Sequence, residues 1–329
     1  MKKYLQITLV FLLFLCIIPM LALLVKKDSH EIGETVIDKK LDDIKNVRIL
    51  DEKNGEIIEL SLHDYLVGAV LAQMPYDFEE EALKAQAVLA HTYILSRREA
   101  EMREATPALS GADISLDSKV YQPYFDNESV KALYGDKADD AIKRVSSAVS
   151  EAEKEVAEYK GELIISAFHG ISSGFTESAE NAWGIDIPYL QSVESEFDPS
   201  SPDYCKKYTI SANELKEALE NAYPDLTFDG DETSWLDISE TSRGGTVLGV
   251  GIGDEKLVVS GYDLMKVLDL RSPHFKISYS GGEFTFTVCG CGHLVGMSQY
   301  GANELAKTGK DHLTVLKFYF KGIDIVTLE

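Results

Sequence analysis

The sequence predicts an α+β protein with a single transmembrane helix at its amino end, and three stretches carry this prediction. Residues 4–25 form an uncharged apolar run of about 22 residues, which is long enough to span a bilayer. Residues 62–95 have apolar spacings near 3.6, which indicate two helices that meet at Pro75. Residues 236–259 contain short apolar runs between Gly and charged turns, which favour antiparallel strands.

The apolar run is expected to act as an uncleaved anchor. A signal peptide has a shorter apolar core and a small-x-small cleavage site, and Met20-Leu21-Ala22 is a poor match to such a site. We therefore expect residues 1–27 to hold a short tip and the anchor, residues 28–46 a polar stalk, and residues 47–329 the body. Two lysines flank the run on each side, so they do not decide its orientation.

Composition and charge limit the functions that the chain can have. With 329 residues and 45% hydrophobic content, the chain can bury a substantial core. A net charge of −23 argues against general nucleic-acid binding, which depends on Lys and Arg to neutralise phosphates. The same charge argues against adhesion to anionic lipid through a basic surface, and its simplest interpretation is solubility.

Four cysteines do not predict a disulfide framework. Cys16 lies in the apolar run, which leaves an odd number outside it. Cys289, Cys291 and His293 alternate, so a strand would place them on one face. Zinc held there with Cys205 or His169 is the alternative to inert buried cysteines. The spacing does not match a zinc-finger pairing, so we predict no metal and no cofactor.

The helical corner is the clearest local signal in the body. Pro75 disfavours helical geometry at Met74, so the first helix should end near Gln73. Asp77 and Glu80 have the spacing of an N-cap and its reciprocal carboxylate, which predicts the start of the second helix.

Polar side chains project from both of these predicted helices. Gln73 lies in the last turn of the first helix and faces the corner, while Lys84 and His91, seven residues apart, share one face of the second. Because the two helices are rich in Ala and can pack closely, the corner is a candidate wall of a functional site.

The remaining elements follow from local patterns. Residues 47–62 alternate around Asn54-Gly55, a strong hairpin signal. Residues 127–135 are expected to form a surface loop. Further predictions are helices at 139–156, 211–222 and 260–270, and strands at 162–168 and 283–288.

Three separated motifs give the chain a family resemblance. Residues 62–93 read LHDYLVGAVLAQMPYDFEEEALKAQAVLAHTY and resemble the opening motif of the stage II sporulation protein D (SpoIID/LytB) family, membrane-anchored lytic transglycosylases of peptidoglycan. Residues 167–183, AFHGISSGFTESAENAW, resemble the family's second motif. Residues 290–302, GCGHLVGMSQYGA, resemble its last motif, with Cys291 and Leu294 as departures. The resemblance covers residues 47–325.

The resemblance implies a particular reaction. A lytic transglycosylase cleaves the MurNAc–GlcNAc bond when the sugar's own C6 hydroxyl attacks C1, which leaves a 1,6-anhydro end. One carboxyl protonates the leaving oxygen and then removes the hydroxyl proton, so its pKa must be raised. A Glu in the last turn of a helix meets this need, because the negative end of the helix dipole favours the neutral form.

This sequence departs from the family at two positions that matter for that chemistry. It has Gln73 where the family has its catalytic Glu, and His91 where the family has Arg. Glutamine donates a hydrogen bond but delivers no proton, so the resemblance implies a glycan-binding protein whose cleavage is weakened or lost. The alternative is that Gln73 only fills a polar corner.

The motifs also supply candidate substrate-binding residues. The alternative interpretation of Lys84 and Gln86 is that they lie on an ordinary solvated helix face. His169 and His293 are expected to hydrogen-bond substrate, with a structural role as the alternative. The full set of candidates is Lys84, Gln86, His91, Tyr93, His169, Ser172, Ser173, Thr176, Glu177, His293, Ser298 and Gln299.

Three carboxylates are candidates for a replacement acid. Glu177 and Glu180 are three residues apart and would share a face on a helical turn, and Asp77 is close to the corner in sequence. Solvated turn carboxylates are the simpler interpretation of all three.

The resemblance finally implies a location and partners. It implies a cytoplasmic amino end, an exported body facing the space between the mother-cell and forespore membranes, and a role in engulfment. Peptidoglycan glycan strands and sporulation proteins of the stage II P and M type are the implied partners. A second hypothesis is a non-catalytic scaffold that recruits a cell-wall hydrolase through protein contacts.

Overall fold

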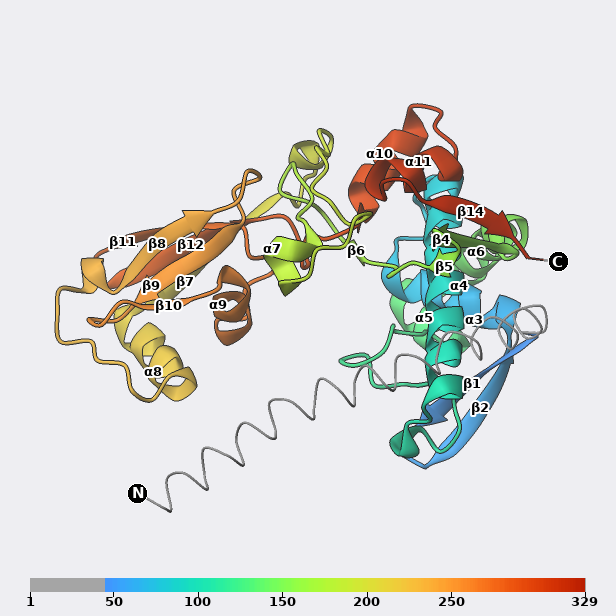
Figure 1. The fold of residues 1–329 in the computed structure, drawn as a ribbon, viewed down its shortest axis with the longest axis horizontal. Helices are drawn as coiled ribbons and strands as arrows, with labels where there is room; N and C mark the ends of the chain where they lie inside the picture. The colour runs from blue at the N-terminus through green and yellow to red at the C-terminus, as the bar shows by residue number, and fades with distance from the viewer. Residues whose placement is uncertain (1–44, 329) are drawn as a thin grey trace, which may run out of the picture. The chain divides into compact units, whose positions relative to one another are not determined.

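The computed structural model describes residues 45–328, and residues 46–327 form one compact unit of mixed helices and strands (Figure 1). The predicted α+β class is therefore confirmed. The predicted membrane span, residues 4–25, and almost all of the predicted stalk lie outside the described residues. Between residues 45 and 328, no helix is long and apolar enough to cross a membrane.

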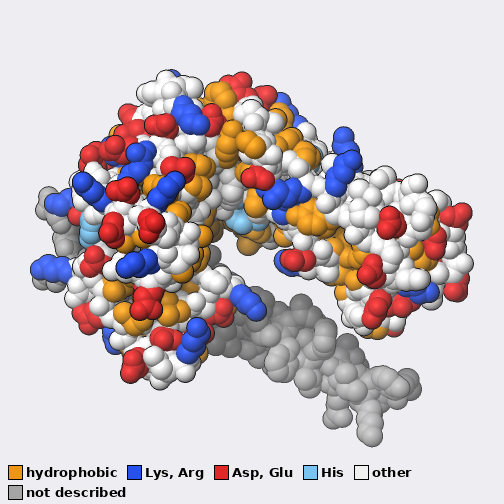
Figure 2. All heavy atoms as spheres, turned by 180° about the vertical axis from the view of Figure 1, so that it is seen from behind, with side chains coloured by type: hydrophobic (Ala, Val, Ile, Leu, Met, Phe, Trp, Pro, Cys, Tyr) orange, Lys and Arg blue, Asp and Glu red, His pale blue; other side chains and the backbone are white. Residues whose placement is uncertain are grey.

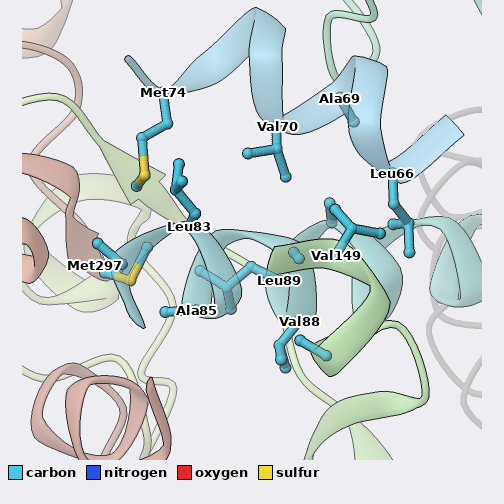
Figure 3. Close-up of a cluster of buried hydrophobic side chains, with 14 of the residues drawn as sticks. Leu66, Ala69, Val70, Met74, Leu83, Ala85, Val88, Leu89, Val149 and Met297 are labelled. Atoms are coloured by element: carbon cyan, nitrogen blue, oxygen red, sulfur yellow. The ribbon is translucent and has the colours of Figure 1, made fainter. Parts of the chain in front are cut away.

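The helical corner and three small sheets build the first hydrophobic core. Helices α3 (Leu62–Gln73), α4 (Glu80–Arg103) and α6 (Ala138–Ala152) pack against one another, and Leu66, Val70, Leu83, Leu89 and Val149 meet between them (Figure 3). The other elements around this core are β1 (Asn46–Asp51), β2 (Glu56–Ser61), β3 (Ile114–Ser115), α5 (Asn127–Tyr134), β4 (Glu155–Tyr159), β5 (Glu162–Leu163), β6 (Phe168–His169), β13 (Met297–Ser298), α10 (Gln299–Lys307), α11 (His312–Tyr319) and β14 (Asp324–Thr327).

A second hydrophobic core is formed by residues that all lie between 212 and 288. Its two three-stranded antiparallel sheets have the orders β11-β12-β7 and β10-β9-β8. Phe284, Phe286 and Val288 of β12 are buried, as their alternation predicted. The elements are β7 (Cys205–Ser211), α8 (Ala212–Ala222), β8 (Leu236–Thr241), β9 (Val247–Ile252), β10 (Leu257–Val259), α9 (Gly261–Val267), β11 (Phe275–Ser280) and β12 (Glu283–Cys289). The short helix α7 (Ala179–Trp183) precedes this part of the chain.

Several local predictions are confirmed. β1 and β2 form the expected hairpin, with Asp51 paired to Glu56 across the turn. Helix α3 ends at Gln73, and Met74 leaves the helix in an extended conformation, as Pro75 requires. Ser211 and Glu214 form a complete capping box at the start of α8.

Other local predictions are wrong at element boundaries. Asp77 does not cap α4, which begins at Glu80 after Glu79 and has no side-chain cap. Residues 127–134 are helix α5 and not a loop, because Asp126 accepts a hydrogen bond from the Ser129 amide as an N-cap. The predicted helix 139–156 ends at Ala152, and the strand expected at 162–168 is reduced to β5 and β6.

The cysteine prediction is also wrong. Cys205 and Cys289 form a disulfide between β7 and β12, where the two residues are directly opposite in the strand register. The alternation of Cys289, Cys291 and His293 is broken because Gly290 has a φ of +82°, so the strand ends there. The disulfide removes Cys205 and Cys289 from the zinc alternative.

Charged side chains of both signs cover the body. On the face that Figure 2 shows, Lys and Arg side chains are interspersed with the more numerous Asp and Glu side chains. This arrangement fits a solubility role for the net charge of −23.

Candidate functional site

Three glutamines meet at the corner between α3 and α4. Gln86 is fully buried and donates from Nε2 to Gln73 Oε1 over 2.7 Å. Gln299, the first residue of α10, donates from Nε2 to the Gln73 backbone carbonyl over 2.9 Å and to Gln86 Oε1 over 3.2 Å. The first and last motifs therefore meet at position 73.

The hydrogen bonds fix the direction of each amide. Gln299 donates to the oxygen of Gln86, so the Gln86 nitrogen points at Gln73. Gln73 accepts with its oxygen, and its Nε2 donates to the Pro123 carbonyl over 3.4 Å. The corner therefore presents one donor and one acceptor to the side chain at position 73, and an amide satisfies both.

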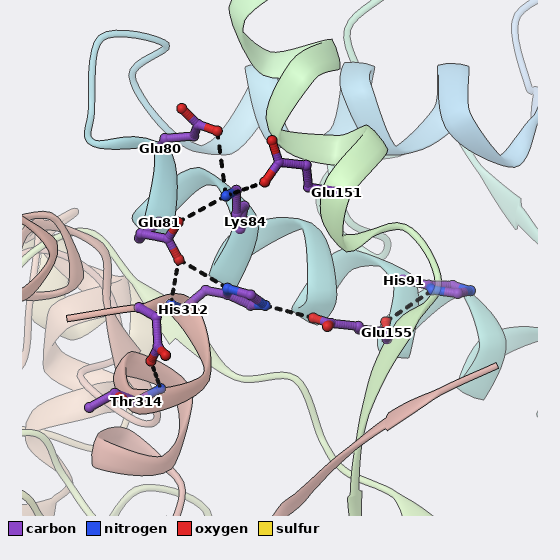
Figure 4. A network of polar contacts seen from close by, with 9 residues as sticks. Glu80, Glu81, Lys84, His91, Glu151, Glu155, His312 and Thr314 are labelled. Atoms are coloured by element: carbon purple, nitrogen blue, oxygen red, sulfur yellow. Dashed lines mark hydrogen bonds and ion pairs between the residues drawn. The ribbon is translucent and has the colours of Figure 1, made fainter. Parts of the chain in front are cut away.

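Lys84 is held by carboxylates and not by the corner. Its Nζ lies 2.5 Å from Glu151, 2.8 Å from Glu81 and 3.4 Å from Glu80, and the side chain is only 10% exposed (Figure 4). Burial lowers the pKa of Lys84, but hydrogen bonds to Glu151 and Glu81 outweigh it and leave the pKa raised. Lys84 is a permanent cation that links α4 to α6.

His91 lies further along α4 and is also buried. Its Nδ1 donates to the Glu155 backbone carbonyl over 3.1 Å (Figure 4). Burial lowers the pKa of His91 to about 4, so the ring is neutral near pH 7. Within residues 45–328, no hydrogen bond or ion pair joins Gln73 to Lys84 or His91. Tyr93, the next candidate on α4, accepts from the Gln122 amide.

The second and last motifs lie side by side. β6 pairs with β13 in parallel, with Phe168 opposite Met297 and His169 opposite Ser298. The rings of His169 and His293 are 6.0 Å apart, and the half-exposed Trp183 ring lies 5.8 Å from His293.

Both histidines in this pair are neutral. Burial, with the proximity of His293 as a smaller cause, lowers the pKa of His169 to about 3. Burial lowers the pKa of His293 to about 4, although a hydrogen bond with the Phe168 backbone acts in the opposite direction and raises it. His169 donates from Nδ1 to the Val295 carbonyl, and its buried Nε2 has no partner among the described residues. These rings can accept hydrogen bonds but are poor proton donors at neutral pH.

Most hydroxyl candidates are used inside the fold. Ser172 and Ser298 donate to the two oxygens of the fully buried Asp198, over 2.7 and 2.6 Å. Ser173 contacts backbone carbonyls, and Thr176 accepts from the Val193 amide. Asp198, through Ser172 and Ser298, ties the second motif to the last one.

The candidate replacement acids differ in their surroundings. Glu177 is buried and accepts from the Ser178 amide and from Asn181 Nδ2, while Glu180 and Asp77 are exposed. No hydrogen bond or ion pair in the described part of the chain connects any of them to Gln73.

Sequence reasoning missed Pro123, Asp198 and Trp183 as parts of these arrangements. Pro123 acts only through its backbone carbonyl, which no side-chain pattern reveals. Asp198 has two hydroxyl partners that lie 26 and 100 residues away in sequence, so no local pattern reveals its contacts.

Comparison with known proteins agrees with this layout. Residues 51–159 match the family model described as "Stage II sporulation protein". The chain is 34% identical over 280 residues to the Stage II sporulation protein D of Bacillus amyloliquefaciens, which covers 85% of this chain and 78% of that protein. This chain belongs to the stage II sporulation protein D family.

Two Bacillus subtilis (strain 168) proteins extend the comparison. The chain is 34% identical over 272 residues to Stage II sporulation protein D, covering 83% of this chain and 76% of the relative. It is also 25% identical over 308 residues to a protein named Amidase enhancer, covering 80% of this chain and 40% of that protein. Membership of the family therefore rests on most of the chain and not on the three motifs alone.

Proposed function

We propose that this protein acts in sporulation as a membrane-anchored, peptidoglycan-binding member of the stage II sporulation protein D family whose glycan cleavage is weakened or lost. The relatives named Stage II sporulation protein D support the sporulation role. The amide at position 73, where we expect the family's catalytic acid, supports the loss of cleavage.

The contacts of Gln73 carry this proposal. Gln86 offers a donor, and the Pro123 carbonyl offers only an acceptor. A neutral carboxylic acid at position 73 would satisfy both, whereas a carboxylate would face the Pro123 oxygen with a second oxygen and raise the energy of the charged form. The corner is therefore arranged for a protonated acid, which is the form that a general acid needs.

Glutamine satisfies the same contacts without supplying a proton. General acid–base catalysis is worth roughly 10²–10⁴-fold in rate, so the present chain is expected to bind glycan and cleave it poorly. Because Gln and Glu are nearly equal in size, the surroundings of position 73 can persist without the reaction.

The first experiment measures release of 1,6-anhydro-muropeptides from purified peptidoglycan by the natural chain and by Gln73→Glu. We expect little release by the natural chain and a gain of at least tenfold for the variant. The matched control is Gln191→Glu, the same change at an exposed position whose side chain contacts Asp186 and Ile187. Strong release by the natural chain would refute the loss of cleavage.

His91→Arg is the natural second change, because the family has Arg there. His91 is only 2% exposed, so an added guanidinium must enter a buried site beside the Glu155 carbonyl. We expect Gln73→Glu alone to restore more activity than the double variant. Absence of gain in both variants would mean that the pocket has been remodelled.

The location of the body is part of the same proposal. The Cys205–Cys289 disulfide supports an exported body, because such bonds persist on the oxidising side of the membrane. We propose an anchor in residues 4–25 and a body outside the cytoplasm. Protease added to intact protoplasts should digest the body, and complete protection would refute this orientation.

A second candidate function is a scaffold that recruits a cell-wall hydrolase. The similarity to the protein named Amidase enhancer favours it, and proteins of the stage II P and M type are the proposed partners. Sedimentation with purified sacculi separates the two candidates. If the protein ignores sacculi but retains such a partner, the glycan-binding proposal fails and the scaffold remains.

A further inference from the structure

A serine, a histidine and a glutamate form a connected line between α3 and α6. His63 Nδ1 donates to Glu153 Oε2 over 2.6 Å, and His63 Nε2 lies 2.9 Å from Ser146 Oγ. Since the carboxylate can only accept, Nδ1 carries a proton, and in the neutral ring Nε2 accepts from the serine hydroxyl. One tautomer thus satisfies both bonds.

These distances match the arrangement found around an activated nucleophile. A hydroxyl in contact with a base, whose other nitrogen is oriented by a third group, is the general arrangement of nucleophilic catalysis. The three groups come from different places: His63 from the first turn of α3, Ser146 from α6, and Glu153 from the C-cap of α6. Nothing in the chemistry proposed for Gln73 uses them.

The line opens into a cavity of about 550 Å³. Ser146 and His63 both line it, so the hydroxyl and its base face space that a small molecule can occupy. Apolar side chains from α3, α5 and α6 form much of its wall, and these are Val67, Leu71, Val130 and Ile142.

The charged residues around the cavity determine which charge of ligand it favours. Asp64, Asp126 and Glu128 line it, and all three are exposed. Within the described chain, no Lys or Arg lines this cavity. An acidic mouth over an apolar wall favours a cationic or neutral molecule over an anionic one.

The cavity also holds groups that can face a developing negative charge. The amino end of α5 lines it at Asp126, Asn127 and Glu128, and because the Asp126 carboxylate already accepts from the Ser129 amide, the donor left for an oxyanion is the Asn127 side-chain amide. Asn127 has an exposed side-chain amide that forms no hydrogen bond within the described residues.

We propose that Ser146, His63 and Glu153 form a second site that transfers acyl groups from small esters with a cationic group near the ester. Ser146 Oγ forms a bond to the carbonyl carbon while its proton passes to His63 Nε2. The ester bond breaks, and the leaving alcohol takes that proton. Water then attacks the acyl-serine with His63 again as base, which releases the carboxylic acid and restores the hydroxyl. Glu153 positions the ring.

The full chain is tested with two probes that do not involve peptidoglycan, so a failure of the proposed glycan function leaves this test intact. A biotinylated fluorophosphonate should label one serine per chain, and peptide mass mapping should place it at Ser146. Acetylcholine should be hydrolysed at least tenfold faster than an anionic hemisuccinate ester, with the preference reduced by salt.

Variants separate a nucleophile from a structural link between α3 and α6. Ser146→Ala should abolish labelling and lower ester hydrolysis at least tenfold, whereas Ser147→Ala, its exposed neighbour on α6, should leave both unchanged. His63→Gln can retain hydrogen bonds to both partners but cannot take a proton, so it should fold normally and lose labelling. Glu153→Gln should slow labelling at least fivefold.

Two results would overturn the proposal. One is an absence of fluorophosphonate at Ser146 in the folded natural chain. The other is a His63→Gln variant that labels and hydrolyses as the natural chain does, since the line would then be a structural link only. Circular dichroism of each variant confirms that folded chains are compared.

Discussion

Replacement of Asp198 by alanine should destabilise the body more than any single surface change. Asp198 is fully buried, and its two oxygens accept from Ser172 and Ser298, which belong to the second and last motifs. A hydrogen bond to a charged group is worth about 1.5–3 kcal/mol, so the loss of both should cost about 3–6 kcal/mol. Two buried hydroxyls would also lose their acceptor.

The assays are urea unfolding and thermal unfolding of the oxidised protein at pH 7, each followed by tryptophan fluorescence. For a unit of this size, 1 kcal/mol shifts Tm by about 2–4 °C, so we expect a fall of about 10 °C. Asp198→Asn retains one acceptor oxygen and should show an intermediate loss.

Asp203→Ala is the matched control for this series. Asp203 is five residues away, and among the described residues its exposed carboxylate contacts only Lys206, in an ion pair of 3.4 Å. Its replacement should change the free energy of unfolding by less than about 0.5 kcal/mol. A loss below about 1 kcal/mol for Asp198→Ala would refute the view that this carboxylate holds the two motifs together.

Three further predictions concern other parts of the body. Replacement of both Cys205 and Cys289 by serine should lower the free energy of unfolding by about 4–5 kcal/mol, because the disulfide closes a loop with a sequence separation of 84. The urea midpoint of the reduced natural chain should match that of the variant. His91 has a pKa near 4 in the folded protein against an ordinary 6.5, because burial favours the neutral ring. The contribution of the neutral ring to the free energy of unfolding is therefore complete above pH 6.5 and is lost as pH falls towards 4. The His91→Gln variant should show a shallower pH dependence of the urea midpoint. Gly68→Ala should cost about 1–3 kcal/mol, since a Cβ there would lie 2.5 Å from the Phe125 carbonyl oxygen, and an unchanged midpoint would contradict the close approach.

The sequence was most informative where local chemistry decides the structure. Pro75 ends α3 at Gln73, two residues before the proline, and the Ser211–Glu214 box starts α8. The same reasoning could have found α5, because Asp126 is followed by Ser129 at N-cap spacing. The loop assignment there gave too much weight to polar composition.

The glutamine contacts needed the structure because they depend on helix phase and on tertiary pairing. Lys84 and His91 share a face of α4, but Gln86 is rotated by about 200° from Lys84, so only one of the two faces can meet Gln73. Helical spacing identified the face with Lys84 and His91 and the face with Gln86, but it did not decide which face meets Gln73. Gln299 reaches the corner from 226 residues away in sequence, which no local pattern encodes.

The Cys205–Cys289 bond has an architectural consequence beyond stability. The second core is built entirely between residues 212 and 288, and the bond joins the two points where the chain enters and leaves it. The disulfide therefore holds together the two ends of the segment that contains the second core. β6 and β13, which flank that segment, pair through residues outside it. The register of the paired motifs therefore does not depend on any residue of the second core.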